Sequence, residues 1–263
     1  MARLPIGVQL YSVRHDFAND ARGTLKAVAE MGYEGVEFAG DPPIGKEGAA
    51  EELKGYLDEF GLKCCGWHTP YHRVADDQID DTIAFNKTLD NKYVIVPGIP
   101  GNLRQSRDDW LKLAVQFNQV ADRLAEEGMV TGYHNHSVEF QPLDGELPWE
   151  TFFSATNKGV AMQLDIGNAM SGGGDVVKTL SDYPGRALTV HLKPYSPSLA
   201  EKEGHGAAFR QVIGQDEAPW DEVFRLCEST AGTEWYIVEY ESNAYPPLEA
   251  VERCLKALKE MGK

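Results

Sequence analysis

Short β-type runs alternate with amphipathic helical segments along the whole 263-residue chain. These runs cover residues 6–12, 35–39, 62–68, 93–97, 129–136, 160–165, 187–193 and 235–239. Eight strand-plus-helix units at nearly constant spacing, with no Gly/Ser-rich linker, predict one α/β domain over residues 1–263, a (β/α)8 TIM barrel. A doubly wound open sheet is the alternative. That fold needs a glycine-rich turn after the first strand, and residues 12–16 read Ser-Val-Arg-His-Asp.

The charge balance narrows the classes of partner. The chain has 25 Lys and Arg against 41 Asp and Glu, a formal net charge of −16, so we expect no nucleic-acid partner. No apolar run reaches the roughly 18 residues of a membrane span. Residues 1–6 contain no apolar secretory segment, and the four cysteines form no Cys-x-x-Cys pair. We therefore expect a cytoplasmic protein with buried free thiols and no membrane partner.

Acidic and histidine residues follow the last four predicted strands. Asp165, His191 and Glu239 come directly after apolar strand cores, and Glu139 lies a few residues past the fifth strand. Because barrel active sites lie at the carboxyl ends of the strands, these side chains are expected to meet. Three converging carboxylates repel one another unless a cation lies between them. The predicted ligands of one divalent metal ion are therefore Glu139, Asp165, His191 and Glu239.

Such a mostly oxygen ligand set with one imidazole suits Mn²⁺ first, then Mg²⁺ or Co²⁺, and Zn²⁺ also fits. Glu139 is the weakest member because it lies past the strand, and His134 or His136 could replace it as a ligand. Strand alternation places these two histidines on the same face, both expected to point into the barrel. One of them would act as a general acid or base, with His134 as the predicted catalytic residue beside Glu139 and Glu239.

Other residues at the predicted rim are candidates for substrate contacts. They are Glu37, His68, His136 and Lys193. Three of them have an equally plain structural interpretation: Glu37 as a surface acid, His68 as a hydrogen-bonded buried histidine and Lys193 as a solvated lysine. The stretch 194–219 is rich in Pro and Gly and is predicted to be a long ordered loop or a mobile lid.

Several longer motifs surround these residues, and they are Gly-Val-Gln-Leu-Tyr-Ser-Val-Arg (7–14), Gly-Tyr-His-Asn-His-x-x-Glu-Phe (132–140), Leu-Asp-Ile-Gly-Asn (164–168), His-Leu-Lys (191–193) and Val-Glu (238–239). Together they resemble the sugar phosphate isomerase/epimerase family of the xylose isomerase-like TIM barrel superfamily. The resemblance implies a divalent metal held by Glu139, Asp165, His191 and Glu239. Two departures lie near strand seven, where Pro194 replaces a usual Asp and residues 214–220 depart from a Gly-x-Gly-x-x-Asp-Trp pattern.

The leading functional hypothesis is a metal-dependent isomerase or epimerase that acts on a ketose or related small sugar through an enediolate. A metal-dependent lyase or dehydratase, similar to inosose dehydratase or to enzymes that cleave 3-keto-glycosides by elimination, shares the chemistry up to that intermediate. The net charge argues against an abasic-site endonuclease, and a non-catalytic sugar-binding barrel is a further alternative. Near the last strands only Lys193 and Arg210 could bind a substrate phosphate group, which favours an unphosphorylated substrate. Dimerisation into a homodimer is a further hypothesis.

Overall fold

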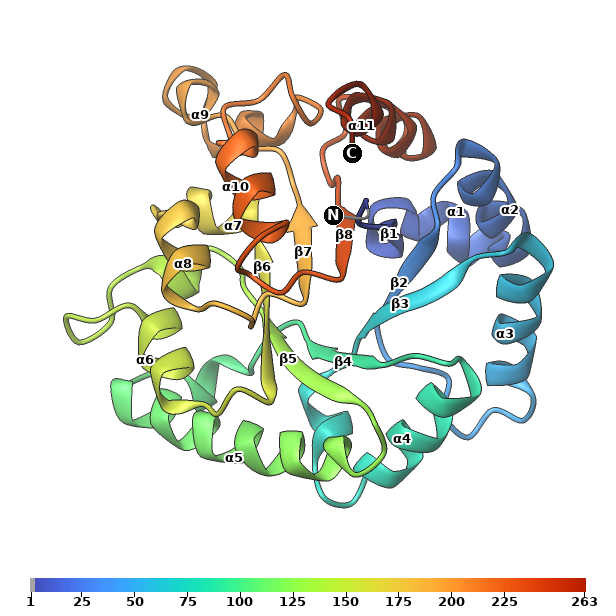
Figure 1. The fold of residues 1–263 in the computed structure, drawn as a ribbon, viewed down its shortest axis with the longest axis horizontal. Coiled ribbons are helices and arrows are strands. Elements are labelled where there is room, and N and C mark those ends of the chain that lie inside the picture. The colour runs from blue at the N-terminus through green and yellow to red at the C-terminus, as the bar shows by residue number, and fades with distance from the viewer. Residues whose placement is uncertain (1–2) are drawn as a thin grey trace.

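The computed structural model describes residues 3–263 as a closed barrel of eight parallel strands, which pair in chain order with β8 returning to β1 (Figure 1). This arrangement confirms the predicted (β/α)8 TIM barrel. The strands are β1 (Ile6–Gln9), β2 (Gly35–Ala39), β3 (Lys63–His68), β4 (Tyr93–Val96), β5 (Val130–His134), β6 (Val160–Asp165), β7 (Thr189–Leu192) and β8 (Trp235–Val238).

Helices surround the strands on the outside of the barrel (Figure 1). They are α1 (Arg14–Asn19), α2 (Ala21–Met31), α3 (Ala49–Phe60), α4 (Ile79–Thr88), α5 (Arg107–Ala125), α6 (Pro148–Ala155), α7 (Ile166–Ser171), α8 (Val176–Asp182), α9 (Pro197–Glu203), α10 (Trp220–Cys227) and α11 (Pro247–Glu260). Helix α5 shows why they form. The Ser106 side chain caps its first turn by accepting from the Asp109 amide at 3.2 Å, and one face buries Trp110, Leu113 and Phe117 against the strands.

Two strands end two or more residues earlier than the sequence predicts. Strand β1 stops at Gln9, whose side-chain oxygen accepts from the Tyr11 amide at 3.0 Å and starts a 3-10 turn. Strand β5 stops at His134, because Asn135 turns to the neighbouring strand and pairs with the main chain of Asp165. His136 therefore lies beyond the strand, is exposed, and does not share the face of His134 by strand alternation.

The stretch 194–219 is folded rather than an extended loop. It contains helix α9 and a 3-10 turn, η5 (His205–Phe209), and the Ser196 amide donates to the Ala208 carbonyl at 2.9 Å. The Asp216 carboxylate accepts from the main-chain amides of Tyr195 and Gly214 and, at 2.7 Å, from the indole of Trp220. This carboxylate ties both ends of the stretch together.

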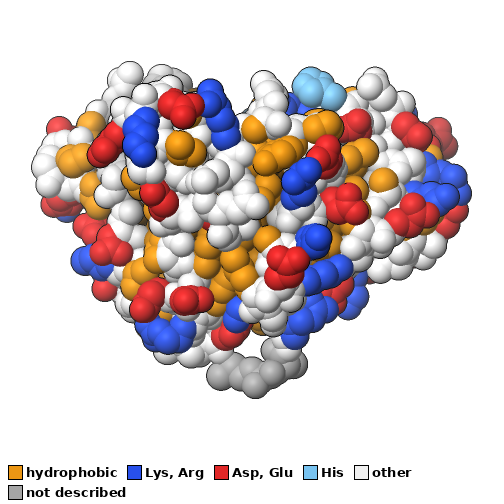
Figure 2. All heavy atoms as spheres, turned by 90° about the horizontal axis from the view of Figure 1, so that it is seen from above, with side chains coloured by type: hydrophobic (Ala, Val, Ile, Leu, Met, Phe, Trp, Pro, Cys, Tyr) orange, Lys and Arg blue, Asp and Glu red, His pale blue; other side chains and the backbone are white. Residues whose placement is uncertain are grey.

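The charged residues on the surface and the burial of the cysteines agree with what the sequence predicts. On the face shown in Figure 2, Lys and Arg side chains lie among Asp and Glu side chains. Within residues 3–263, no helix has both the length and the apolar character needed to cross a bilayer. All four cysteines are buried and free, as predicted.

Candidate metal centre

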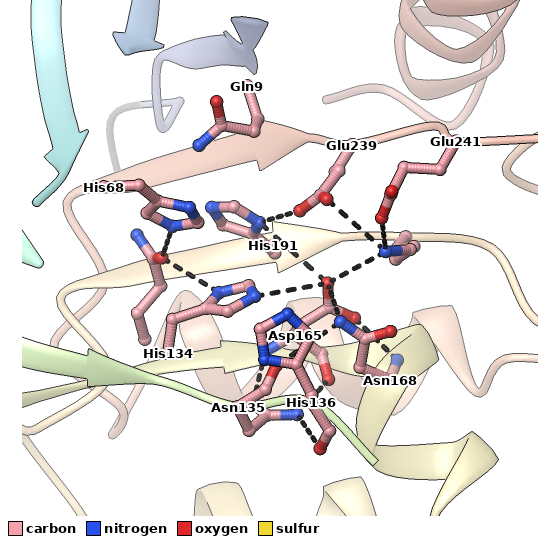
Figure 3. A network of polar contacts seen from close by, with 12 residues as sticks. Gln9, His68, His134, Asn135, His136, Asp165, Asn168, His191, Glu239 and Glu241 are labelled. Carbon is pink, nitrogen blue, oxygen red and sulfur yellow. Dashed lines mark hydrogen bonds and ion pairs between the residues drawn. The ribbon is translucent and has the colours of Figure 1, made fainter. Parts of the chain in front are cut away.

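Four buried side chains from the last four strands converge at the carboxyl end of the barrel (Figure 3). They are His134 on β5, Asp165 on β6, His191 on β7 and, just after β8, Glu239, with one ligand atom of each within 4.8 Å of the others. Asp165 Oδ2 lies 4.0 Å from both His134 Nε2 and His191 Nδ1, and the latter is 2.6 Å from Glu239 Oε2. Of the four predicted ligands, the structure therefore brings Asp165, His191 and Glu239 together.

Glu139 lies outside this cluster, which corrects its prediction as a metal ligand. It is on the 3-10 turn η4 (Val138–Phe140), where its carboxylate accepts from the Tyr133 hydroxyl at 2.7 Å and from the His136 amide at 2.8 Å. With these bonds made and the residue only 2% exposed, the carboxylate is occupied by protein donors and does not face the cluster. His134, the alternative that the sequence left open, takes the fourth position, so it is part of the cluster rather than a separate base.

The donor set fits a divalent cation. Two imidazoles and two carboxylates, all buried, converge on one point, and such groups are otherwise costly to bury. Burial, reinforced by the charge of Glu239, raises the pKa of Asp165 in the absence of a cation. Burial and the neighbouring rings of His68 and His191 hold the pKa of His134 well below its usual value, so it is a neutral ring, as a ligand must be.

Two asparagines hold Asp165 in place. The Asn168 amide donates to Asp165 Oδ1 at 2.7 Å, so Asp165 also caps helix α7. Asn168 Nδ2 donates to Oδ2 at 3.1 Å, and Asn135 Oδ1 accepts from the Asp165 main-chain amide at 2.8 Å. Oδ2 is thereby aimed at the two histidines of the cluster.

Glu37 lies beneath the cluster, not at the rim, which corrects its prediction as a substrate contact. It is completely buried and accepts from Gln9 Nε2 at 2.7 Å, Gln163 Nε2 at 2.8 Å and His191 Nε2 at 2.5 Å. Burial alone would raise the pKa of Glu37, but His68, His191 and Gln163 outweigh it and lower the pKa, so the carboxylate is ionised. A carboxylate behind a ligating histidine orients the ring. Glu37 therefore supplies the partner that the missing Asp at position 194 could have given His191.

Lys193 is not a solvated lysine. It is 4% exposed, forms an ion pair with Glu241, and its Nζ lies 3.4 Å from Glu239 Oε1 and 4.0 Å from Asp165 Oδ2. Burial would lower the pKa of Lys193, but these three carboxylates outweigh burial and raise it. Its ammonium therefore offsets part of the negative charge of the cluster.

A cavity of about 500 Å³ opens beside the cluster, and two of the predicted substrate-contact residues line it. These are His136, which is exposed, and His68, which is 7% exposed with its Nε2 2.6 Å from Gln163 Oε1. The His136 and His134 ring centroids are 5.2 Å apart. The other walls come from the loops after β2, β3 and β4, and they consist of Gly40, Pro70, Tyr71, His72, Pro97, Gly98 and Pro100.

Sequence reasoning missed five residues that position the cluster. They are Gln9, Asn135, Gln163, Asn168 and Glu241. One available signal was an amide inside an otherwise apolar strand, as in Ala-Met-Gln-Leu-Asp (161–165), where Gln163 is two residues from Asp165 and so shares its face. The asparagines carry no such signal, because Asx residues next to strand ends are common in turns.

The closed β/α barrel carries a buried His/Asp/His/Glu group at the carboxyl ends of its strands, the end at which the active sites of barrel enzymes lie. The chain belongs to the xylose isomerase-like TIM barrel family, whose model matches residues 25–261. This match confirms the superfamily resemblance read from the motifs.

Individual relatives are distant. The chain is 24% identical over 246 residues to the rhizopine catabolism protein MocC of Rhizobium meliloti, covering 83% of this chain and 74% of that protein. It is 25% identical over 253 residues to the inosose dehydratase of Glaesserella parasuis, covering 83% and 82%. A sugar phosphate isomerase/epimerase from Parabacteroides distasonis shares its fold, with a TM-score of 0.80 at 23% identity over 98% of both chains. One of these relatives is thus named as a dehydratase, and one protein of the same fold as a sugar phosphate isomerase/epimerase.

Proposed function

We propose that the chain is a divalent-metal-dependent lyase that eliminates water, or another leaving group, from a keto-carbohydrate. Isomerisation or epimerisation of the same class of substrate is the second candidate. The observation that carries this choice is the supply of acid–base groups. Glu139 and Glu239, the carboxylates expected to act as bases, are both bonded to protein groups, whereas His136 is an accessible imidazole on the cavity. The similarity to inosose dehydratases supports the same choice.

The proposed ligands of the metal are His134, Asp165, His191 and Glu239. A divalent ion bound there supplies a Lewis acid that makes the C–H next to a carbonyl more acidic. With two nitrogen and two oxygen donors, the set suits Mn²⁺, Co²⁺ or Zn²⁺ better than Mg²⁺, which prefers oxygen ligands. We propose Mn²⁺ as the resident ion.

His136 is the proposed acid–base residue. Its ring takes the proton from the carbon next to the carbonyl, and the C–H electron pair becomes the new C=C bond as the bond to the β-hydroxyl breaks. The same ring returns the proton to the departing hydroxyl, which leaves as water, so one group completes the elimination. Epimerisation needs a second donor on the opposite face. Of the other two imidazoles on the cavity, His68 is nearly buried and bonded to Gln163, and His72 is exposed with its Nε2 3.8 Å from Asp41 Oδ2.

The test is to incubate the Mn²⁺-loaded protein in D₂O with an inosose and, separately, with a 3-keto-glucoside. We expect the dehydrated diketone or the free aglycone as product. His136→Asn is expected to lower turnover by roughly 10²- to 10⁴-fold, the usual share of one acid–base group, with Mn²⁺ content unchanged. His205→Asn, an exposed histidine away from the cavity, is the control. Recovery of a deuterated epimer without elimination would instead establish the second candidate.

A further inference from the structure

We propose that Gln163 is a positioning residue that fixes the tautomers of His68 and His134, and thereby selects the nitrogen that His134 presents to the cation. The inference rests on the cluster of the proposed function but not on the reaction that the chain catalyses. It follows from three steps, each of which depends on which atoms can donate a hydrogen bond and which can only accept one.

The orientation of the Gln163 amide is the first step. Gln163 lies in the middle of β6 and is completely buried. Its Nε2 donates to Glu37 Oε1 at 2.8 Å and to Thr189 Oγ1 at 2.9 Å. An ionised carboxylate only accepts, so rotating the amide would place its oxygen against the Glu37 oxygen with no hydrogen between them. The amide is therefore held with Oε1 turned away from Glu37.

The second step concerns the two rings that face Oε1. His68 Nε2 lies 2.6 Å and His134 Nδ1 lies 3.0 Å from this oxygen (Figure 3). Because an amide oxygen only accepts, both nitrogens carry the hydrogen. A neutral imidazole has one donor and one acceptor nitrogen, so the lone pair of His134 is on Nε2. That nitrogen faces Asp165 Oδ2 at 4.0 Å, inside the cluster.

The third step concerns His191, whose two ring nitrogens both face carboxylates. Glu37 Oε2 accepts from Nε2 at 2.5 Å and Glu239 Oε2 accepts from Nδ1 at 2.6 Å, so without a cation both nitrogens carry a hydrogen. A cation bound at Nδ1 would replace the hydrogen there, while Glu37 keeps Nε2 as the donor. The Glu37–Gln163 pair, joined across the barrel from β2 to β6, thus contacts all three rings.

This arrangement also decides between two overlapping histidine groups. His68, His134 and His191 form a second buried group with ligand atoms within 4.8 Å of one another. A cation there could not use His68 Nε2 or His134 Nδ1 while both donate to Gln163. The lone pair of His134 therefore lies on Nε2, the nitrogen that faces Asp165.

The tautomer can be measured directly on the metal-free wild-type protein. Long-range ¹H–¹⁵N spectra of the ¹⁵N-histidine-labelled chain distinguish protonated from unprotonated ring nitrogens, and the His134 signals are assigned by their loss in His134→Asn. We expect His134 to carry its hydrogen on Nδ1. A wild-type spectrum with the hydrogen on Nε2 overturns the proposal. Because neither metal nor substrate is present, this result is independent of whether the chain is a lyase.

The variant Gln163→Leu then tests the consequence for the cation. We expect His134 to lose its single tautomer and Mn²⁺ affinity, measured by calorimetry, to fall roughly 10- to 100-fold, as when other partners of ligating histidines are removed. Thr131→Val is the matched control, since Thr131 lies on neighbouring β5 and donates a buried hydrogen bond to the Val94 carbonyl on β4, outside this network. An unchanged tautomer in Gln163→Leu, with affinity within about twofold of wild type, contradicts the proposal.

Discussion

At the scale of single residues, Glu37 occupies a position where β/α barrels usually carry branched aliphatic side chains. Three donors and the adjacent His68 ring offset the cost of burying its charge. The neighbouring strand makes room for it at Gly66, where a Cβ atom would overlap Glu37 Oε1. A glycine inside a strand marks such a close approach.

Gly66→Ala is therefore expected to destabilise the protein by about 1–3 kcal/mol, the usual cost of overfilling a packed interior. The matched control is Gly55→Ala on helix α3, where nothing lies within 4 Å of the added methyl group. That variant should gain about 0.5–1 kcal/mol, because alanine is the better helix former. Urea unfolding of both variants measures the difference, and equal effects would contradict the packing described around Glu37.

The correction at Glu139 gives a second prediction. Asp165→Asn removes a carboxylate from the cluster and is expected to weaken Mn²⁺ binding by more than about 100-fold, beyond the loss of an outer partner. Glu139→Gln should keep its Mn²⁺ content, because Glu139 bonds only to Tyr133 and His136 within the described chain. Metal content by plasma mass spectrometry on both variants checks this. Loss of metal from Glu139→Gln would return Glu139 to the ligand set.

Three cluster residues could be predicted because Asp165, His191 and Glu239 directly follow apolar strand cores, where the fold itself places them. The fourth could not, because the path of the chain after β5 is decided by a contact between strands. Asn135 bonds to the main chain of Asp165 and ends the strand, so the choice between His134 and Glu139 depends on tertiary structure.

At the scale of elements, the strands and long helices can be predicted from the spacing of their apolar residues, but helix α9 cannot. Pro and Gly dominate the composition of 194–219 and favour a loop prediction. Within it, Pro197 begins the helix and Gly204 follows its last residue, the usual asymmetry of helix ends. A seven-residue helix is too short to show an apolar period, which is why the composition misled the prediction.

The Asp216 carboxylate is expected to hold this stretch in place. Asp216→Ala leaves the Trp220 indole and several main-chain amides without their acceptor, which costs about 1–3 kcal/mol for a buried group. We expect faster hydrogen exchange and earlier proteolysis confined to residues 194–219. Glu217→Ala, next in sequence but exposed, should stay within about 0.5 kcal/mol of wild type. Equal exchange in both variants would contradict this role.

At the scale of the whole molecule, metal binding should appear as stability. A ligand that binds only the folded state adds about 2.7 kcal/mol at a free concentration 100 times its Kd. For a chain of this size that corresponds to a rise in Tm of roughly 5–10 °C. Thermal unfolding of chelator-treated protein with and without added Mn²⁺ measures it, and Asp165→Asn should show no rise. Equal Tm values for wild type under both conditions would contradict a native-state site.

The hydrogen bond between Gln163 and Glu37 joins positions 126 residues apart and so links the two halves of the chain, which contribute different parts of the site. The half with β5 to β8 contributes all four proposed cation ligands, while the half with β1 to β4 contributes the carboxylate behind them. A polypeptide cut between β4 and β5 would keep its ligands but lose the anchor that aligns them. Ion affinity would then return only when the two fragments reassemble into one barrel.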